Sequence, residues 1–315
     1  MAPLQSTRSA PIGRVAVVGL GALGTVYASR IHACDPEALW VVLDPIRRAH
    51  YPPVVWVNQT PYEFRYATPE EVPAPVDLVL LTVKQHHLDR TLEEIAPLVG
   101  ATTQILPLQN GLFSEEVTAR AFGWERVLYA FAVGIDALRQ ERTVTYSQIG
   151  QIVYGERQNR PPSPRVARVA AFFDRVGIPY DIPEDMLRAL WWKFMINVGI
   201  NQTSALLQAP YGVFQRVPAV RAVMEAAMAE VVAVAEREGI GLRAEDIVRF
   251  REVLARLQPE GKTSMLQDIE AGRKTEVDIL ADAVVALGRR HGVPTPLNEA
   301  FAQLLRALEA MRGVG

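Results

Sequence analysis

The stretch that decides the fold is Val15-Ala16-Val17-Val18-Gly19-Leu20-Gly21-Ala22-Leu23-Gly24. An apolar, strand-like run leads straight into a G-x-G-x-x-G pattern, and a helical pattern follows over residues 22–33. Glycines at these positions allow a tight turn, a close approach of the backbone to a pyrophosphate, and close helix–strand packing. The N-terminus of the following helix would face that anion. The sequence therefore predicts a dinucleotide-binding turn over Gly19, Leu20, Gly21, Ala22, Leu23 and Gly24.

The choice of dinucleotide depends on the end of the second β-rich run, at residues 39–43. Asp44 follows this run, 25 residues after Gly19. A carboxylate there would accept hydrogen bonds from the ribose hydroxyls of NAD(H) and repel the 2′-phosphate of NADP(H). Arg47 and Arg48 follow closely and could pair with that phosphate instead. The residues around Asp44 favour NAD(H) as the cofactor, but they do not exclude NADP(H).

Two halves of the chain have different patterns. In the first, β-rich runs alternate with helical stretches such as residues 22–33 and 88–99, which predicts an α/β, Rossmann-like doubly wound sheet. The β-rich runs cover residues 14–18, 39–43, 77–83, 103–108 and 126–133. Residues 142–146 and 151–154 are more typical of a late antiparallel pair.

After Pro183 there is almost no strand signal, and long amphipathic patterns predict an all-α domain. These patterns cover residues 217–238, 244–257, 264–288 and 296–311. The expected organisation is a flexible tail over residues 1–13, a dinucleotide-binding domain over residues 14–183, and a helical domain for substrate and catalysis over residues 184–315.

A polar stripe is predicted in the helical domain. In the apolar run from Trp191 to Asn201, the strongly polar side chains stand at Lys193, Asn197 and Asn201. Steps of four residues place all three on one face of an α-helix. A lysine inside such a run must reach solvent or be held by partners that tolerate a buried cation. The stripe is either the solvated edge of an amphipathic helix or the wall of a polar pocket with a proton-donating lysine.

Lys84 and Asn110 follow two β-rich runs of the first half. Ligands of open α/β sheets bind at the carboxyl ends of the strands, where both residues are expected to lie. Taken alone, Lys84 is better interpreted as a lysine that flanks a helix, and Asn110 as part of an ordinary Asn-Gly turn.

Composition excludes several classes of protein. The 315 residues carry a net charge of −2, which argues against nucleic acid and anionic membranes as partners. No apolar run is long enough for a membrane span, and residues 1–13 lack the apolar core of a signal peptide. Cys34 is the single cysteine, and the five histidines show no metal-ligand spacing, so we predict no metal site and a cytoplasmic protein.

Taken together, these motifs resemble the ketopantoate reductase family (2-dehydropantoate 2-reductases) over nearly the whole chain. The likeness rests on the glycine-rich turn, on Thr82-Val83-Lys84, on Leu108-Gln109-Asn110-Gly111, and on the Lys193, Asn197 and Asn201 spacing. It also rests on Ser264-Met265-Leu266-Gln267-Asp268 followed by Lys274-Thr275-Glu276-Val277-Asp278.

The resemblance implies a role for each matching residue. Lys193 matches the general acid, and Glu276 matches a residue beside the nicotinamide and the lysine. Asn197, Asn201 and Ser264 match substrate-binding positions, whereas Lys84 and Asn110 match residues at the cofactor and the crevice between domains. The implied reaction is the NAD(P)H-dependent reduction of a small 2-keto acid, ketopantoate, on a helical domain similar to that of 6-phosphogluconate dehydrogenase. The family's usual cofactor is NADPH.

Three residues depart from the family pattern. Tyr211 and Gly261 stand where the family often has substrate-side asparagines, and Asp44 stands in place of the arginine that selects NADPH. Tyr211 would add an aromatic wall, and Gly261 removes a hydrogen-bond donor. These departures leave the identity of the keto acid and the choice of cofactor open.

The sequence is compatible with other interpretations of its function. An NAD-linked D-2-hydroxyacid dehydrogenase that acts on a bulkier keto acid would fit Asp44, Tyr211 and Gly261. A dinucleotide sensor without catalysis is an alternative of another class, although it has no need for both Lys193 and Glu276. The polar stripe alone does not exclude an amine-forming reductase. The apolar helical half is compatible with a homodimer.

Overall fold

The structure is a computed structural model, and it describes residues 10–314, which form two compact units. Unit 1 comprises the described residues up to Gln109 together with Phe113–Met186. Unit 2 comprises Asn110–Leu112 and the residues from Leu187 onward. The division thus falls after Met186 rather than after Pro183, and the short segment Asn110–Leu112 belongs with the helical unit, which the sequence did not indicate.

The predicted tail is wrong for residues 10–13. Ile12 is 2% exposed, and its carbonyl accepts a hydrogen bond of 2.6 Å from Arg175. The carbonyl of Ala10 accepts one of 2.7 Å from Arg168, and the amide of Gly13 donates to Asp77 at 2.9 Å. The rest of that prediction, residues 1–9, lies outside the described residues.

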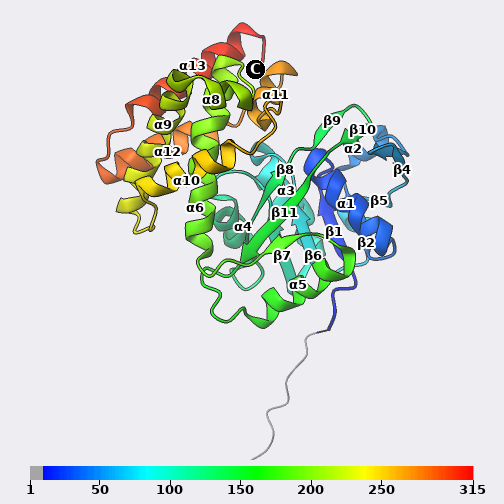
Figure 1. Ribbon diagram of the computed structural model, residues 1–315. Helices are drawn as coiled ribbons and strands as arrows, with labels where there is room; N and C mark the ends of the chain where they lie inside the picture. Colours follow the sequence, from blue (N-terminus) through cyan, green and yellow to red (C-terminus); the bar gives the residue numbers. More distant parts are fainter. Residues whose placement is uncertain (1–9, 315) are drawn as a thin grey trace, which may run out of the picture. The chain divides into compact units, whose positions relative to one another are not determined.

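Unit 1 is built on a five-stranded sheet in which every pairing is parallel, as predicted for a Rossmann-like fold (Figure 1). Its spatial order is β5-β2-β1-β6-β7. The strands are β1 (Val15–Val18), β2 (Leu39–Val42), β5 (Tyr66–Ala67), β6 (Val76–Leu81) and β7 (Val99–Pro107). The helices are α1 (Ala22–Cys34), α2 (Pro45–His50), α3 (Leu88–Ile95), α4 (Ser114–Phe122) and α5 (Pro164–Val176). The helix predicted over residues 88–99 ends early, because residues 96–98 tighten into a 3₁₀ turn and β7 begins at Val99.

Both faces of this sheet are covered, which explains why the buried parts of its strands are mostly apolar. Successive side chains of a strand point to opposite faces. In β1, Val15 and Val17 pack into one cluster with side chains of α1 and α5. Ala16 and Val18 pack into the other cluster with side chains of α3 and α4.

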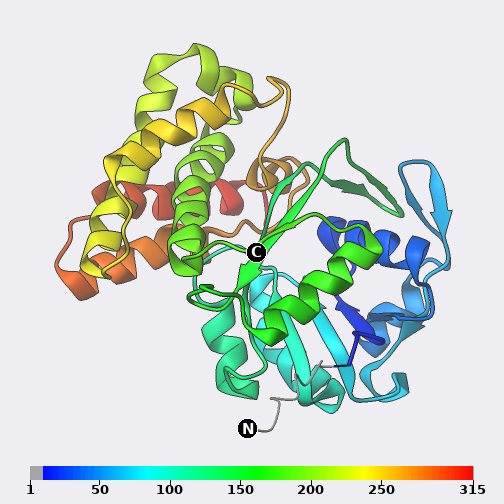
Figure 2. The same cartoon turned by 60° about the horizontal axis from the view of Figure 1, so that its bottom comes forward.

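Two smaller sheets complete unit 1 and correct two predictions. The run at residues 126–133 overlaps β8 (Tyr129–Ile135), which belongs to a three-stranded sheet with β11 (Ile149–Gly155) and β12 (Tyr180–Asp181). Val127, just before β8, forms an isolated bridge with Ile105 of β7. The runs at residues 142–146 and 151–154 do not pair with each other. β10 (Thr143–Thr145) instead pairs with β9 (Leu138–Gln140) and β3 (Val55–Val57), whereas β11 pairs with β8. Figure 2 shows the β9–β10 hairpin beside the hairpin of β3 and β4 (Thr60–Tyr62).

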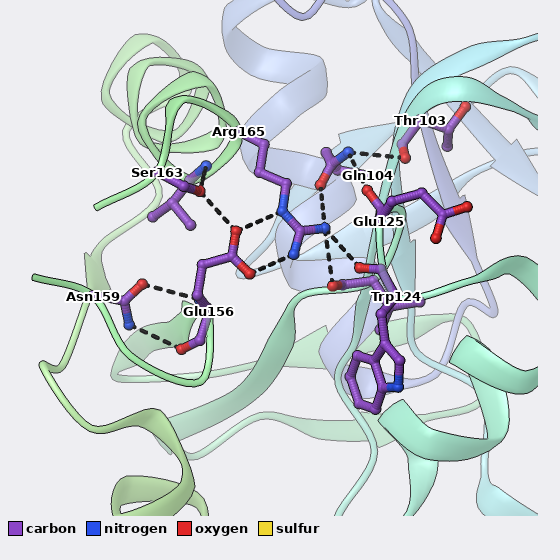
Figure 3. Close-up of polar contacts among 10 residues, drawn as sticks. Thr103, Gln104, Trp124, Glu125, Glu156, Asn159, Ser163 and Arg165 are labelled. Carbon is purple, nitrogen blue, oxygen red and sulfur yellow. Dashed lines mark hydrogen bonds and ion pairs between the residues drawn. The ribbon is translucent and has the colours of Figure 1, made fainter. Parts of the chain in front are cut away.

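A polar network fastens α5 to the segment between α4 and β8 (Figure 3). Arg165, near the start of α5, forms an ion pair with Glu156 and donates to the carbonyls of Trp124 at 2.9 Å and Val127 at 3.2 Å. Ser163 donates to Glu156 at 2.7 Å. Burial raises the pKa of Glu156, but the hydrogen bonds from Arg165 and Ser163 outweigh it and hold that pKa below its usual range.

Unit 2 is helical, and none of its described residues forms a strand. Its helices are α6 (Met186–Ile196, which begins at the last residue of unit 1), α7 (Gln202–Leu207), α8 (Tyr211–Arg216), α9 (Pro218–Arg237), α10 (Ala244–Leu254), α11 (Ser264–Glu270), α12 (Ala281–His291) and α13 (Pro296–Met311). Fully buried side chains such as Met224, Met228, Leu280 and Leu305 form its core. No helix of the described residues is both long and apolar enough to cross a membrane.

The single helix predicted over residues 264–288 is wrong. The chain leaves α11 at Ala271, and Gly272 adopts a φ of +63°, a conformation that glycine tolerates best. Thr275 then donates both its amide (2.7 Å) and its hydroxyl (2.6 Å) to the buried carboxylate of Glu309 on α13. A 3₁₀ turn over Val277–Ile279 follows, with Glu276 as its N-cap residue.

Candidate active site

The glycine-rich turn of unit 1 has the geometry of a dinucleotide cradle. Gly19 adopts a φ of +90°, and Gly21 is the N-cap residue of α1. A Cβ atom on Gly24 would stand 2.2 Å from the carbonyl oxygen of Gly19 and 2.5 Å from Oγ1 of Thr82. Gly24 thus lets α1 start directly against the turn, which Thr82 braces with a 2.5 Å hydrogen bond to the Gly19 carbonyl.

The N-terminus of α1 is suited to an anion. Gly21 offers no side-chain cap, and the first turn of α1 contains no acidic residue. The first amide groups of a helix have no partner within the helix, so they are available to a phosphate. A Cβ atom built on Gly21 would meet nothing within 4 Å, so the backbone is open to close approach there. The turn therefore fits the diphosphate of a nicotinamide dinucleotide.

Asp44 and the turn line one hollow at the carboxyl ends of the strands. Its lining residues are Val18, Gly19, Val42, Leu43, Asp44, Arg47, Pro69, Val83, Thr91, Glu94 and Ile95. Asp44 also caps α2, because its side chain accepts a hydrogen bond of 2.9 Å from the amide of Arg47. The Arg47 guanidinium pairs with the same carboxylate at 3.4 Å, and Arg48 pairs with Glu71 at 2.6 Å. Both arginines are thus engaged by carboxylates of unit 1.

Lys84 lies at the same edge of the sheet as the glycine-rich turn. β6 ends at Leu81, and the amide of Thr82 donates to the Val18 carbonyl of β1 at 2.9 Å. Lys84 is the partly buried N-cap residue of a 3₁₀ turn at residues 85–87. Its contact with a cofactor stays a prediction.

Unit 2 brings together four of the predicted site residues. Nδ2 of Asn197 donates to Oδ1 of Asn110 at 3.1 Å, and Nδ2 of Asn110 donates to Oε2 of Glu276 at 2.8 Å. The donor and acceptor ends of Asn110 are thereby both fixed. Burial lowers the pKa of Lys193 from 10.5 to about 8, and the negative charge of Glu276 counters part of that effect.

The polar stripe is not one regular α-helix. α6 ends at Ile196, and Asn197–Asn201 form a π-helical turn before α7 begins. A Cβ atom on Gly199 would stand 2.5 Å from Cγ of Met228, so α9 packs closely against this turn. Asn197 and Asn201 are 3% and 7% exposed, which excludes the solvated edge as an interpretation of these two positions. Single π turns inside helices occur frequently at functional sites.

Ser264 is the site residue that the structure connects least to this cluster. It is exposed, in the first turn of α11. Thr263 rather than Ser264 caps α11, because its side chain accepts a hydrogen bond from the Leu266 amide at 3.2 Å.

Tyr211 and Gly261, which both depart from the family pattern, contact each other. The amide of Tyr211 donates to the Gly261 carbonyl at 2.9 Å. A Cβ atom on Gly261 would stand 2.9 Å from Cδ2 of the Tyr211 ring. The tyrosine ring therefore occupies the space next to residue 261 that a side chain there would need, and the glycine accommodates the ring.

Two further residues had no sequence signal that pointed to a site. Glu309 fixes Thr275, the neighbour of Glu276, through the two hydrogen bonds described above. Arg139 reaches the glycine-rich turn from β9 and donates to the carbonyl of Leu20. Both contacts join segments that are far apart in the chain.

Comparisons with known proteins cover both units. A family model described as ketopantoate reductase PanE/ApbA matches residues 15–159, and one described as ketopantoate reductase PanE/ApbA C terminal matches residues 185–309. The 2-dehydropantoate 2-reductase of Halobacterium salinarum is 32% identical over 240 residues, which cover 76% of this chain and 78% of that protein.

Solved structures agree. The crystal structure of 2-dehydropantoate 2-reductase from Geobacter metallireducens GS-15 has a TM-score of 0.82 and 31% identity, over 93% of this chain and 99% of that one. A ternary structure of D-mandelate dehydrogenase with NADH and anilino(oxo)acetate has a TM-score of 0.83 and 20% identity, over 96% and 100% of the two chains. At that identity the second likeness shows the fold alone.

Proposed function

Because the chain belongs to the ketopantoate reductase family, we propose that it reduces a 2-keto acid to the 2-hydroxy acid with a nicotinamide dinucleotide, and that the keto acid is ketopantoate. The observation that carries this proposal is the cluster of Lys193, Glu276, Asn110 and Asn197 in unit 2. A lysine whose pKa lies near neutrality, beside a carboxylate held by carboxamides, is suited to proton transfer.

The proposed reaction needs a hydride and a proton. A reduced nicotinamide, when bound, supplies a hydride to the C2 carbonyl of the keto acid. Lys193 gives its proton to the oxygen that becomes an alkoxide, and its positive charge stabilises that oxygen as the negative charge develops. With a pKa of about 8, Lys193 is protonated about ten to one at pH 7 and still releases its proton readily.

The neighbours of Lys193 hold it in this state. Glu276 prevents burial from lowering the lysine pKa further. Asn110 and Asn197 orient Glu276 through their chain of hydrogen bonds. We assign Asn197, Asn201 and Ser264 to the binding of substrate oxygens, with Asn110 at both cofactor and substrate.

The substrate itself is tested by a panel of keto acids. Because the Tyr211 ring takes up space beside Gly261, the two departures from the family pattern offset each other in volume. We therefore expect the highest kcat/KM with ketopantoate, measured as loss of NADH or NADPH absorbance, and a lower value with bulkier or aromatic 2-keto acids. A preference for an aromatic keto acid would favour the D-2-hydroxyacid dehydrogenase. Cofactor binding without turnover of any keto acid would favour the sensor.

For the cofactor, we propose that Asp44 favours NADH. Asp44→Asn tests this sharply, because asparagine is as good an N-cap residue as aspartate and removes only the charge. The ratio of kcat/KM for NADPH to that for NADH should rise about tenfold or more, since a 2′-phosphate no longer meets a carboxylate. An unchanged ratio would mean that Asp44 serves only to cap α2.

The homodimer also stays a proposal. Several large apolar side chains of unit 2 are exposed, among them Leu207, Val248 and Leu304. Exposed apolar side chains are compatible with an interface between copies when they form a contiguous patch.

A further inference from the structure

Arg139 extends from a peripheral hairpin to the glycine-rich turn. It lies in β9, the edge strand of the β4-β3-β10-β9 sheet. Its Nη1 atom donates to the carbonyl of Leu20 and to the hydroxyl of Tyr51. That hydroxyl donates to the same Leu20 carbonyl at 2.6 Å, and the guanidinium carbon lies 5.0 Å from the centre of the Tyr51 ring. The cation is therefore held against the residue that precedes Gly21.

Within the described part of the chain, no carboxylate forms an ion pair with Arg139. Among residues 10–314, Arg139 forms no ion pair, and its guanidinium donates only to two carbonyl oxygens and the Tyr51 hydroxyl. The two arginines that follow Asp44 are each paired with a carboxylate, as described above. A partly buried cation is costly unless an anion meets it. An anion bound at this turn would be that counter-charge.

Two electropositive features thus meet at Leu20 and Gly21. One is the N-terminus of α1, which has neither a capping side chain nor an acidic residue in its first turn. The other is the Arg139 guanidinium. A guanidinium presents N–H groups in a planar fork that matches two phosphate oxygens, and it can keep one donor on a carbonyl while others bind.

We propose that Arg139 binds the diphosphate of the dinucleotide, and that the β9–β10 hairpin is part of the cofactor site. This inference rests on the proposed function only because it takes the bound anion to be part of a dinucleotide. Tyr51 is a positioning residue, because it holds the guanidinium through its ring and hydroxyl.

Direct binding to the intact protein tests the proposal without turnover. ADP and NADH titrations are made by calorimetry, and adenosine, which has no phosphate, is followed by ligand-observed NMR. Arg139→Met should weaken ADP and NADH about 10- to 100-fold and leave adenosine unchanged, since it removes charge-assisted hydrogen bonds to phosphate. Arg139→Lys should lose less affinity for ADP and NADH than Arg139→Met, because it keeps the positive charge. Added salt should weaken ADP binding more in the wild type than in Arg139→Met.

Arg142→Met is the matched control, because Arg142 is an exposed arginine between β9 and β10 and the variant removes the same charge from the same hairpin. We expect it to bind ADP within about threefold of the wild type. Equal losses for ADP and adenosine, an ADP affinity that Arg139→Met leaves intact, or a loss in Arg142→Met as large as in Arg139→Met would each overturn the proposal. The last result would show that the general positive charge of the hairpin, and not a contact from Arg139, attracts the phosphate. A chain that binds ADP through Arg139 but reduces no keto acid would refute the proposed function and leave this inference standing.

Discussion

Replacing Lys193 with methionine is expected to lower kcat for keto acid reduction by about a hundredfold or more, the usual loss when a positioned proton donor is removed. The variant loses both the proton and the positive charge that stabilises the developing alkoxide. Methionine has a similar length and is apolar, so it fills the same partly buried position without a cation. We therefore expect folding to be retained.

Two measurements separate this loss from a general defect. The glycine-rich turn lies in unit 1, so Lys193→Met should bind NADH with nearly wild-type affinity in a calorimetric titration. Lys262→Met is the matched control, because Lys262 is an exposed lysine of unit 2 that pairs with Glu270 at 2.7 Å. This second variant should turn over at the wild-type rate. Near-normal turnover in Lys193→Met would remove Lys193 from the mechanism.

The second large effect is expected at the third glycine of the turn. Gly24→Ala places a methyl group 2.2 Å from a backbone carbonyl, that of Gly19, which cannot move aside as a flexible side chain could. Overpacking of this kind costs about 1–3 kcal/mol, so the Tm should fall by about 2 to 12 °C. The affinity for NADH should fall at least tenfold, because α1 and the turn must separate.

Gly21→Ala distinguishes packing from cofactor binding. A Cβ atom there meets nothing within 4 Å, and Gly21 has an ordinary φ of −73°, so the Tm should stay within about 1 °C of the wild type. The added methyl group nevertheless lies where the backbone meets the diphosphate, and we expect about a tenfold loss of NADH affinity. Wild-type affinity in Gly21→Ala would show that the diphosphate does not lie over this turn.

Features set by local sequence were predicted well. The strand, turn and helix around Gly19 follow from neighbouring residues, and α13 begins and ends at the predicted residues, Pro296 and Met311. Proline at a first helical position sets the start of a helix locally. The fold class was also predicted from local signals, because alternating strand and helix patterns specify a doubly wound sheet. The structure and its solved relative confirmed that prediction.

Features set by distant contacts were not predictable from spacing. The π-helical turn forms where Gly199 meets Met228 on another helix, and a periodic pattern contains no trace of that contact. The helix predicted over residues 264–288 breaks where Thr275 binds Glu309, which is 34 residues away. Asn110 and Glu276 are separated by 166 residues, so only the family resemblance indicated that they act together.

The most direct test of the Lys193–Glu276 assignment is the pH dependence of kcat/KM for keto acid reduction, which reports on groups of the free enzyme. Lys193 must be protonated to act, and burial lowers its pKa to about 8. We expect the wild-type value to be constant below that pH and to fall about tenfold per pH unit above it. In Glu276→Gln the falling limb should move to lower pH, because the charge that raises the lysine pKa is gone. A limb at the same pH in both proteins, or a rate that rises with pH, would contradict proton donation by a Lys193 tuned by Glu276.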